Sequence, residues 1–199
     1  GATVIRVESS SRLDVCRTIR PFIDGDESPE KSAVFHSTNA GKRMLTINLN
    51  TQEGKRVIKD LVAWADVVTE SFSPKAMKAF GFDYDSLCQI NPDLIMLSTC
   101  LMGQTGPLSM FAGYGNLAAA IAGFYAITGW PDKDPAGPFG AYTDYIAPRF
   151  NAFSSGKEDL SVHTKLMPSH ALEYCRRWFK IGLIDFRAGH VISFFLVCI

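Results

Sequence analysis

Short β-branched runs alternate with amphipathic stretches through the first hundred residues of this 199-residue chain. Residues 51–65 are predicted to form a helix, because Thr51 is a favourable N-cap and the apolar side chains behind it recur at helical spacing. Strands are predicted at residues 4–8, 44–49, 66–70 and 94–98, and short helices from Pro74 and over residues 83–90. Such alternation favours parallel pairing, so the sequence predicts an α/β fold with a mostly parallel sheet flanked by helices.

Ligands of parallel sheets bind beside the carboxyl ends of the strands. Here those ends are the loops after Glu8, Glu70 and Ser98. The loop over residues 99–115 is long and rich in glycine, which is typical of a functional segment. A small-residue helix is predicted at residues 116–127, and a loop rich in proline and glycine then leads to Asp144.

The segments before the second strand are predicted to be irregular. Residues 9–31 are rich in Ser, Asp and Pro, with room for a helical turn or two at residues 13–19. Residues 36–42 are polar and end in a predicted turn at residues 39–42.

Composition excludes several classes of function. The formal net charge is zero, so the chain lacks the basic surface that nucleic acids or anionic membranes select. Five scattered cysteines without a C-x-x-C motif argue against a disulfide framework or a zinc site and favour a reducing compartment. Without a signal peptide, and with a last apolar run shorter than the roughly 20 residues of a membrane span, we expect a cytoplasmic protein.

Asp144 is the candidate catalytic residue. A carboxylate between a glycine-rich loop and a mostly apolar run is often a helix N-cap. The same carboxylate could act as a nucleophile that forms covalent acyl intermediates. Residue types alone leave both interpretations open.

The chain contains, in order, the motifs NAGKRMLTINLNTQEG, ADVVTESFSP, INPDLIMLS, GQTGP and TGWPD, followed by Asp144. This series resembles the class III CoA-transferases, a superfamily that includes formyl-CoA transferase, carnitine CoA-transferase, succinyl-CoA:benzylsuccinate CoA-transferase and α-methylacyl-CoA racemase. The resemblance covers residues 1 to about 153. It implies a Rossmann-like large domain, a smaller second domain and an interlocked homodimer.

The resemblance also implies the reaction, which is transfer of CoA from an acyl-CoA donor to a small organic acid. Asp144 stands at the position of the family's catalytic aspartate, which forms an aspartyl anhydride and then an aspartyl-CoA thioester. No metal and no tightly bound cofactor are expected, because the CoA thioester is itself the substrate. Binding residues for CoA are carried over by position: Ile47, Asn48, Leu49, Asn50, Ser71, Phe72, Ser73, Ala112, Gly113 and Tyr114.

Two departures from the family pattern bear on these expectations. The family often has Asn and a basic residue where this chain has Ser71 and Ala79, so Lys42, Lys75 or Lys78 would have to supply charge for the CoA phosphates. Tyr114 stands where the racemases carry a catalytic His, which favours a transferase over a racemase or isomerase.

The resemblance ends after Phe153, where a polar stretch looks inserted and the expected glycine-lysine turn is absent. We therefore predict a large-domain portion over residues 1–153 and a divergent continuation over residues 154–199, without the small domain. The strand-like start and apolar end of the chain suggest a fragment, so an inactive CoA-binding fragment is a further alternative.

Overall fold

The computed structural model describes residues 3–138, 140–145, 147 and 190–194. The chain divides into two compact units, Gly1–Thr99 with Phe186–Cys198 and Cys100–Asp185 with Ile199. The predicted boundary between residues 153 and 154 lies outside the described residues.

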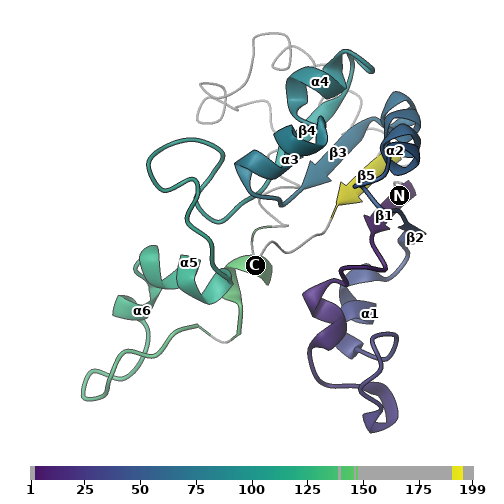
Figure 1. Cartoon of the computed structure of the whole chain (residues 1–199). Helices are drawn as coiled ribbons and strands as arrows, with labels where there is room; N and C mark the ends of the chain where they lie inside the picture. The colour runs from purple at the N-terminus through teal and green to yellow at the C-terminus, as the bar shows by residue number, and fades with distance from the viewer. Residues whose placement is uncertain (1–2, 139, 146, 148–189, 195–199) are drawn as a thin grey trace, which may run out of the picture. The chain divides into compact units, whose positions relative to one another are not determined.

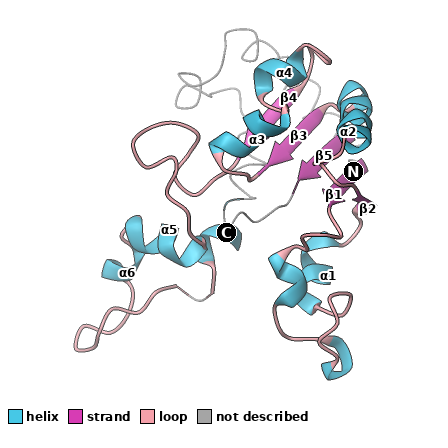
Figure 2. Cartoon of the chain, viewed as in Figure 1, coloured by secondary structure: helices cyan, strands magenta, loops and turns pink. Residues whose placement is uncertain are grey.

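A five-stranded parallel sheet forms the centre of the first unit, in the order β2-β1-β5-β3-β4 (Figure 1). Its strands are β1 (Thr3–Glu8), β2 (Arg43–Thr46), β3 (Val67–Glu70), β4 (Ile95–Ser98) and β5 (His190–Phe194). Helices and strands alternate from β2 to β4, which confirms the predicted α/β fold with parallel pairing (Figure 2).

The central strand β5 comes from a part of the chain where no strand was predicted. It pairs in parallel with β1 on one side and with β3 on the other, so that Ile192 is in register with both Ile5 and Val68. Strand β1 pairs with β2, and β3 pairs with β4. Strand β5 follows these four strands in the sequence and joins the two pairs into one sheet.

Helix α2 (Gln52–Trp64) follows β2 and matches the predicted helix. The Thr51 hydroxyl accepts a hydrogen bond from Gly54 N at 3.0 Å, as an N-cap should. A Cβ on Gly54 would lie 2.1 Å from the carbonyl oxygen of Asn48, so only glycine lets the helix pack this closely on the preceding turn.

Two short helices connect β3 to β4. Helix α3 (Pro74–Phe80) has proline at its first position, where no intrahelical N–H is needed, and it ends at Gly81 in the left-handed conformation. Helix α4 (Tyr84–Cys88) is capped by Asp83, whose carboxylate accepts from Ser86 N at 3.2 Å.

The core of the first unit is formed by the inner faces of the sheet strands and helices. Its members are almost completely inaccessible and bury apolar surface, which is the dominant favourable term in folding. The most deeply buried apolar side chains are Val7, Ile58, Val62, Val68, Phe82 and Leu87.

A buried charged cluster lies between β1 and the segment that follows it. Arg17 donates to both carboxylate oxygens of Glu8, at 2.5 and 3.1 Å, and its guanidinium lies 3.6 Å from the centre of the Phe35 ring. Arg6 donates to Asp14 and to Asn39. Burial lowers the pKa of Arg6, whereas the hydrogen bond with Glu8 raises that of Arg17.

This segment is more regular than predicted. It contains the 3-10 turns η1 (Val15–Thr18) and η2 (Ile23–Gly25) and the helix α1 (Ala33–Asn39). Ser32 begins α1 by accepting from Phe35 N at 3.3 Å. The prediction of an irregular polar segment is therefore wrong at residues 36–39. The helical turn predicted within residues 13–19 is present as η1, and the turn predicted at residues 39–42 is present too.

In the second unit, the predicted helix over residues 116–127 is two helices, α5 (Gly115–Ile121) and α6 (Phe124–Ile127). The break is at Gly123, which has φ 87° and cannot continue a right-handed helix. Residues 142–145 form a further helical turn, and its Tyr142 ring packs 5.0 Å from the ring of Phe124.

The helices of the described residues do not include one whose length and apolar character would suit a bilayer crossing.

Candidate active site

The carboxylate of Asp144 faces the start of α5. Its Oδ2 accepts a hydrogen bond from Gly115 N at 3.3 Å, and the hydroxyl of the neighbouring Thr143 donates to Gly115 O at 3.0 Å. These two contacts join the segment of Asp144 to the end of the glycine-rich loop, 29 residues earlier in the chain.

Gly115 leaves just enough room for this arrangement. A Cβ at this position would lie 2.6 Å from Asp144 Oδ2 and 2.9 Å from Thr143 Oγ1. Both distances are too short for real Cβ contacts, so any side chain at position 115 would push the carboxylate away. Gly115, the last residue of the predicted glycine-rich loop, is thus a part of the candidate site that the sequence did not identify.

Asp144 does not cap its own helical turn, because it lies inside residues 142–145. Instead, its carboxylate reaches the first N–H of α5, where the residue at the N-cap position, Tyr114, makes no side-chain capping bond. A carboxylate is favoured there by the unpaired N–H groups of a helix N-terminus. The interpretation of Asp144 as the N-cap of the helix that follows it is therefore wrong, whereas its role as a reactive group stays a prediction.

Desolvation by burial is the largest effect on the pKa of Asp144 and raises it above its ordinary value of 3.8. The hydrogen bond from Gly115 N acts in the opposite direction. Asp144 as a whole is nevertheless exposed to solvent, so this desolvation is only partial. A carboxylate that is partly desolvated and held by a single N–H remains available to an electrophile.

The predicted residues Ala112, Gly113 and Tyr114 directly precede the N–H that binds Asp144, and all three are exposed. The Tyr114 side chain is 48% exposed. The structure therefore brings this predicted group and the predicted nucleophile together within the second unit.

The predicted residues 47–50 follow β2 and divide into two kinds. Ile47 and Leu49 are buried members of the core, whereas Asn48 and Asn50 are exposed. Asn48 Oδ1 accepts from Asn50 N at 3.0 Å, which shapes the turn into α2. The exposed parts that this segment offers to a ligand are the two asparagines and their backbone.

The predicted residues 71–73 form the loop between β3 and α3. Phe72 belongs to the core and packs edge-on against Phe80, with the ring centres 5.8 Å apart. Ser71 and Ser73 are half-buried. The loop leaves the carboxyl end of β3, which is where ligands of parallel sheets bind.

Among the three lysines considered for the CoA phosphates, Lys42 is half-buried and donates to Asn39 Oδ1 at 3.0 Å. Burial lowers its pKa, and the nearby positive charge of Arg6 adds to this effect. Lys75 and Lys78 are exposed on α3, which starts at the loop of residues 71–73. Lys75, in the first turn, is closest to that loop in sequence.

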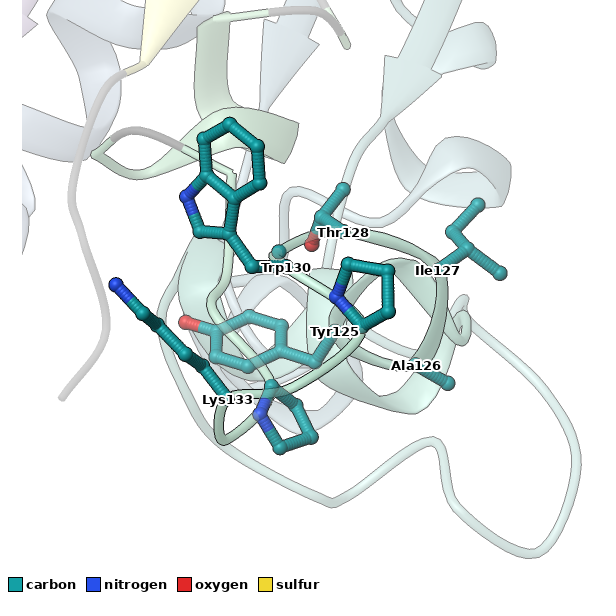
Figure 3. Close-up of a pocket in the computed structure, with 9 residues that line it drawn as sticks. Tyr125, Ala126, Ile127, Thr128, Trp130 and Lys133 are labelled. Carbon is teal, nitrogen blue, oxygen red and sulfur yellow. The ribbon is translucent and has the colours of Figure 1, made fainter.

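Trp130 of the TGWPD motif is not a core residue, since its side chain is 72% exposed. It lines an open cavity of about 320 Å³ between α6 and the following loop, together with Tyr125 and Lys133 (Figure 3). Thr128 holds this loop closed by donating to Phe124 O at 2.7 Å and to Ala136 O. The predicted site residues are not among those that line the cavity.

Comparisons with known proteins find the same family over most of the chain. The model of CoA-transferase family III matches residues 1–155. A succinate–glutarate CoA-transferase of Agrobacterium fabrum is 42% identical over 137 residues, which are 68% of this chain and 34% of that protein. Human succinyl-CoA:glutarate CoA-transferase is 38% identical over 144 residues, which are 72% of this chain and 32% of that protein.

A solved structure supports the same relationship. The crystal structure of a CAIB/BAIF family protein from Brucella suis superposes with a TM-score of 0.70 at 31% identity, covering 96% of this chain and 45% of that one. The chain thus spans about a third of the length of the curated relatives that it matches.

Proposed function

This chain belongs to CoA-transferase family III, and on that basis we propose that the whole protein transfers CoA from an acyl-CoA donor to a small organic acid. The observation that carries this proposal is the carboxylate of Asp144, held 3.3 Å from Gly115 N at the end of a glycine-rich loop. The relatives named above transfer CoA to or from dicarboxylates such as succinate and glutarate, so a dicarboxylate is the first substrate class to test.

The proposed reaction uses Asp144 twice as an acyl carrier. Its carboxylate attacks the thioester carbonyl of the donor, which releases CoA thiolate and leaves a mixed anhydride between Asp144 and the donor acid. The thiolate then attacks the aspartyl carbonyl, which releases the donor carboxylate and leaves an aspartyl-CoA thioester. The acceptor carboxylate repeats the two steps in reverse order, so that acyl-CoA of the acceptor leaves and Asp144 is regenerated.

CoA is the only cofactor-like group that this chemistry requires, and it enters as a substrate. We propose that residues 47–50 and 71–73 bind its nucleotide and pantetheine portions through Asn48, Asn50, Ser71 and Ser73. The residues 112–114 are proposed to bind near the thioester. We also propose that the whole protein is a cytoplasmic homodimer.

Hydroxylamine trapping tests the assignment of Asp144. The chain is incubated with succinyl-CoA and hydroxylamine, digested and analysed by mass spectrometry. An acylated or CoA-linked Asp144 is expected to give an aspartyl hydroxamate at this position. The variant Asp144→Asn should give none, and Asp134→Asn, which removes an exposed acid of the same unit, should react like the unchanged chain.

The alternatives predict different products. If the chain binds CoA but Asp144 remains unmodified, it is a CoA-binding fragment and not a transferase. If solvent protons exchange into the α-carbon of the acyl group without CoA exchange, the activity is that of a racemase or isomerase. If the chain neither binds CoA nor becomes labelled, the proposal is wrong for this chain.

A further inference from the structure

Glu70, the last residue of β3, keeps a carboxylate inside the first unit. The residue is 2% exposed, and its Oε2 accepts a hydrogen bond from Phe72 N at 2.7 Å. The Glu70 side chain, which directly precedes the loop over residues 71–73, therefore holds the backbone of this loop at Phe72. Ser73, the N-cap residue of α3, makes no side-chain capping bond of its own.

Glu70 also connects the ends of two adjacent strands. Its carbonyl oxygen accepts from Thr99 N at 2.8 Å and from the Thr99 hydroxyl at 3.2 Å. Burial raises the pKa of its carboxyl group, and hydrogen bonding with the Ser98 side chain acts in the opposite direction. One residue thus fixes the loop after β3 and the loop after β4, both at the carboxyl edge of the sheet.

A comparison with Glu8 shows how unusual this carboxylate is. Glu8 is the last residue of β1 and is also buried, but Arg17 neutralises it through two hydrogen bonds. Within the described residues, the contacts of the Glu70 carboxylate are hydrogen bonds from a backbone N–H and a hydroxyl, with no cationic partner. Burying an acid costs free energy unless its polar contacts compensate, and here the compensating contacts are those with the backbone of the following loop and with Ser98.

We propose that Glu70 is a positioning residue, whose carboxylate holds the backbone of Ser71–Ser73 in the conformation that binds CoA. The side chain is buried and acts through the loop, without touching the ligand itself. The part of this inference that concerns CoA rests on the proposed function. The part that concerns the loop rests on the contacts of Glu70 alone.

Two substitutions separate the reach of the side chain from its charge. Glu70→Gln keeps an acceptor oxygen at the same distance from the backbone and loses the charge. Glu70→Asp keeps the charge but withdraws the oxygens by one methylene. Glu53→Gln and Glu53→Asp, at an exposed position of α2, serve as matched controls.

CoA affinity is measured by calorimetry, and backbone protection by hydrogen exchange of residues 71–73 and 98–99. We expect Glu70→Asp to weaken CoA binding roughly tenfold or more, as loss of a hydrogen bond to a charged group would. It should also speed the exchange of Phe72 N–H selectively. Glu70→Gln should remain within about threefold of the unchanged chain in affinity and keep its protection, and the Glu53 variants should change neither quantity.

The outcomes are distinguishable. The inference would be overturned if Glu70→Gln and Glu70→Asp had the same CoA affinity as each other and the same exchange rate at Phe72 N–H. A general loss of protection across the sheet in both variants would also overturn it. If the unchanged chain does not bind CoA, the proposed function fails. In that case the exchange of Phe72 N–H in the two variants still decides whether Glu70 positions the loop.

Discussion

At the scale of single residues, the closest packing at the candidate site is between Gly115 and Asp144. Replacing Gly115 by alanine would place a Cβ 2.6 Å from Asp144 Oδ2, and the flexible end of the acid side chain would have to move. Since a displacement of about 1 Å can lower a reaction rate by a factor on the order of 100, we expect Gly115→Ala to reduce hydroxamate formation at Asp144 at least about tenfold.

The free energy of unfolding should change by less than about 1 kcal/mol in this variant, because alanine favours the helix that starts at position 115. Urea unfolding measures this quantity alongside the labelling assay. Asn116→Ala, at the next and exposed position of α5, is the control for both measurements. Unchanged labelling in Gly115→Ala would show that the position of the carboxylate does not matter.

The pKa of Asp144 gives a second prediction at this scale. The proposed nucleophile must be ionised to attack, and burial raises the pKa of Asp144 above the ordinary 3.8. Labelling by acyl-CoA should therefore increase with pH through a midpoint above that value, as initial rates over a pH series would show. A midpoint at or below 3.8 would contradict a desolvated carboxylate.

The same shift predicts the sign of an effect on stability. Because the folded state favours the protonated acid, the contribution of Asp144 is complete below its unfolded pKa and is lost as the pH rises through its folded pKa. As the pH rises through the folded pKa, the unfolding free energy of the unchanged chain should therefore fall relative to that of Asp144→Asn, which has no ionisable group at this position.

Sequence motifs predicted Asp144 as the reactive residue, but they did not predict its hydrogen-bond partner. The hydrogen-bond donor is a backbone N–H, which every residue except proline has, so no residue type marks it. Glu70 was likewise noted only as a strand end, because its burial depends on contacts with Phe72 and Ser98 that form when the strands pair.

At the scale of secondary-structure elements, α2 packs against the turn that precedes it through Gly54. Alanine is the stronger helix former, yet its Cβ would lie 2.1 Å from the backbone oxygen of Asn48, which cannot rotate away. We expect Gly54→Ala to destabilise the protein by about 1–3 kcal/mol, as overpacking does, and to perturb the amide resonances of residues 48–50.

Chemical unfolding measures the loss in stability. Lys59→Ala, on the exposed face of the same helix, should change the unfolding free energy by no more than about 0.5 kcal/mol. A stabilised Gly54→Ala variant would mean that α2 can move away from Asn48 without cost.

Elements whose ends carry local signals were predicted well, and the others were not. Thr51, Pro74 and Asp83 mark the starts of α2, α3 and α4, and all three helices were found from sequence. Helix α1 also has a cap, in Ser32, but its sequence shows no clear apolar stripe, and it was not predicted. The break between α5 and α6 depends on the positive φ of Gly123, which sequence periodicity does not reveal.

At the scale of the whole molecule, the sheet of the first unit depends on β5. Ile192 is paired on both sides, so a proline there removes a ladder hydrogen bond from a central strand. We expect Ile192→Pro to destabilise the sheet by at least about 1–3 kcal/mol, the cost of a buried unpaired carbonyl. Circular dichroism during urea unfolding would measure this loss.

A proline in the edge strand β4 provides the control. Ile95 N and Thr99 N both donate toward β3, so the N–H of Met96 between them points away from β3. Met96→Pro therefore removes no bond of the β3-β4 ladder and should cost less than Ile192→Pro. Equal losses of unfolding free energy in the two variants would show that a proline in β5 costs no more than a proline in β4.

The sheet order could not be predicted as a whole. Four strands were recognised from their β-branched runs, but the strand that joins them lies outside the family-matched residues 1–155. Local patterns report which residues can form strands and not which strands become neighbours. The α/β class was therefore predictable, whereas the central position of residues 190–194 was not.

The order of the strands also has a consequence during synthesis on the ribosome. The nascent chain releases β1 to β4 first, and about ninety residues separate the end of β4 from β5. At typical elongation rates of about 5–20 residues per second, the two strand pairs wait on the order of 5–20 s for the strand that unites them. During that interval the inner edges of β1 and β3 are open to any extended segment, and chaperones that bind such segments would have their main opportunity then.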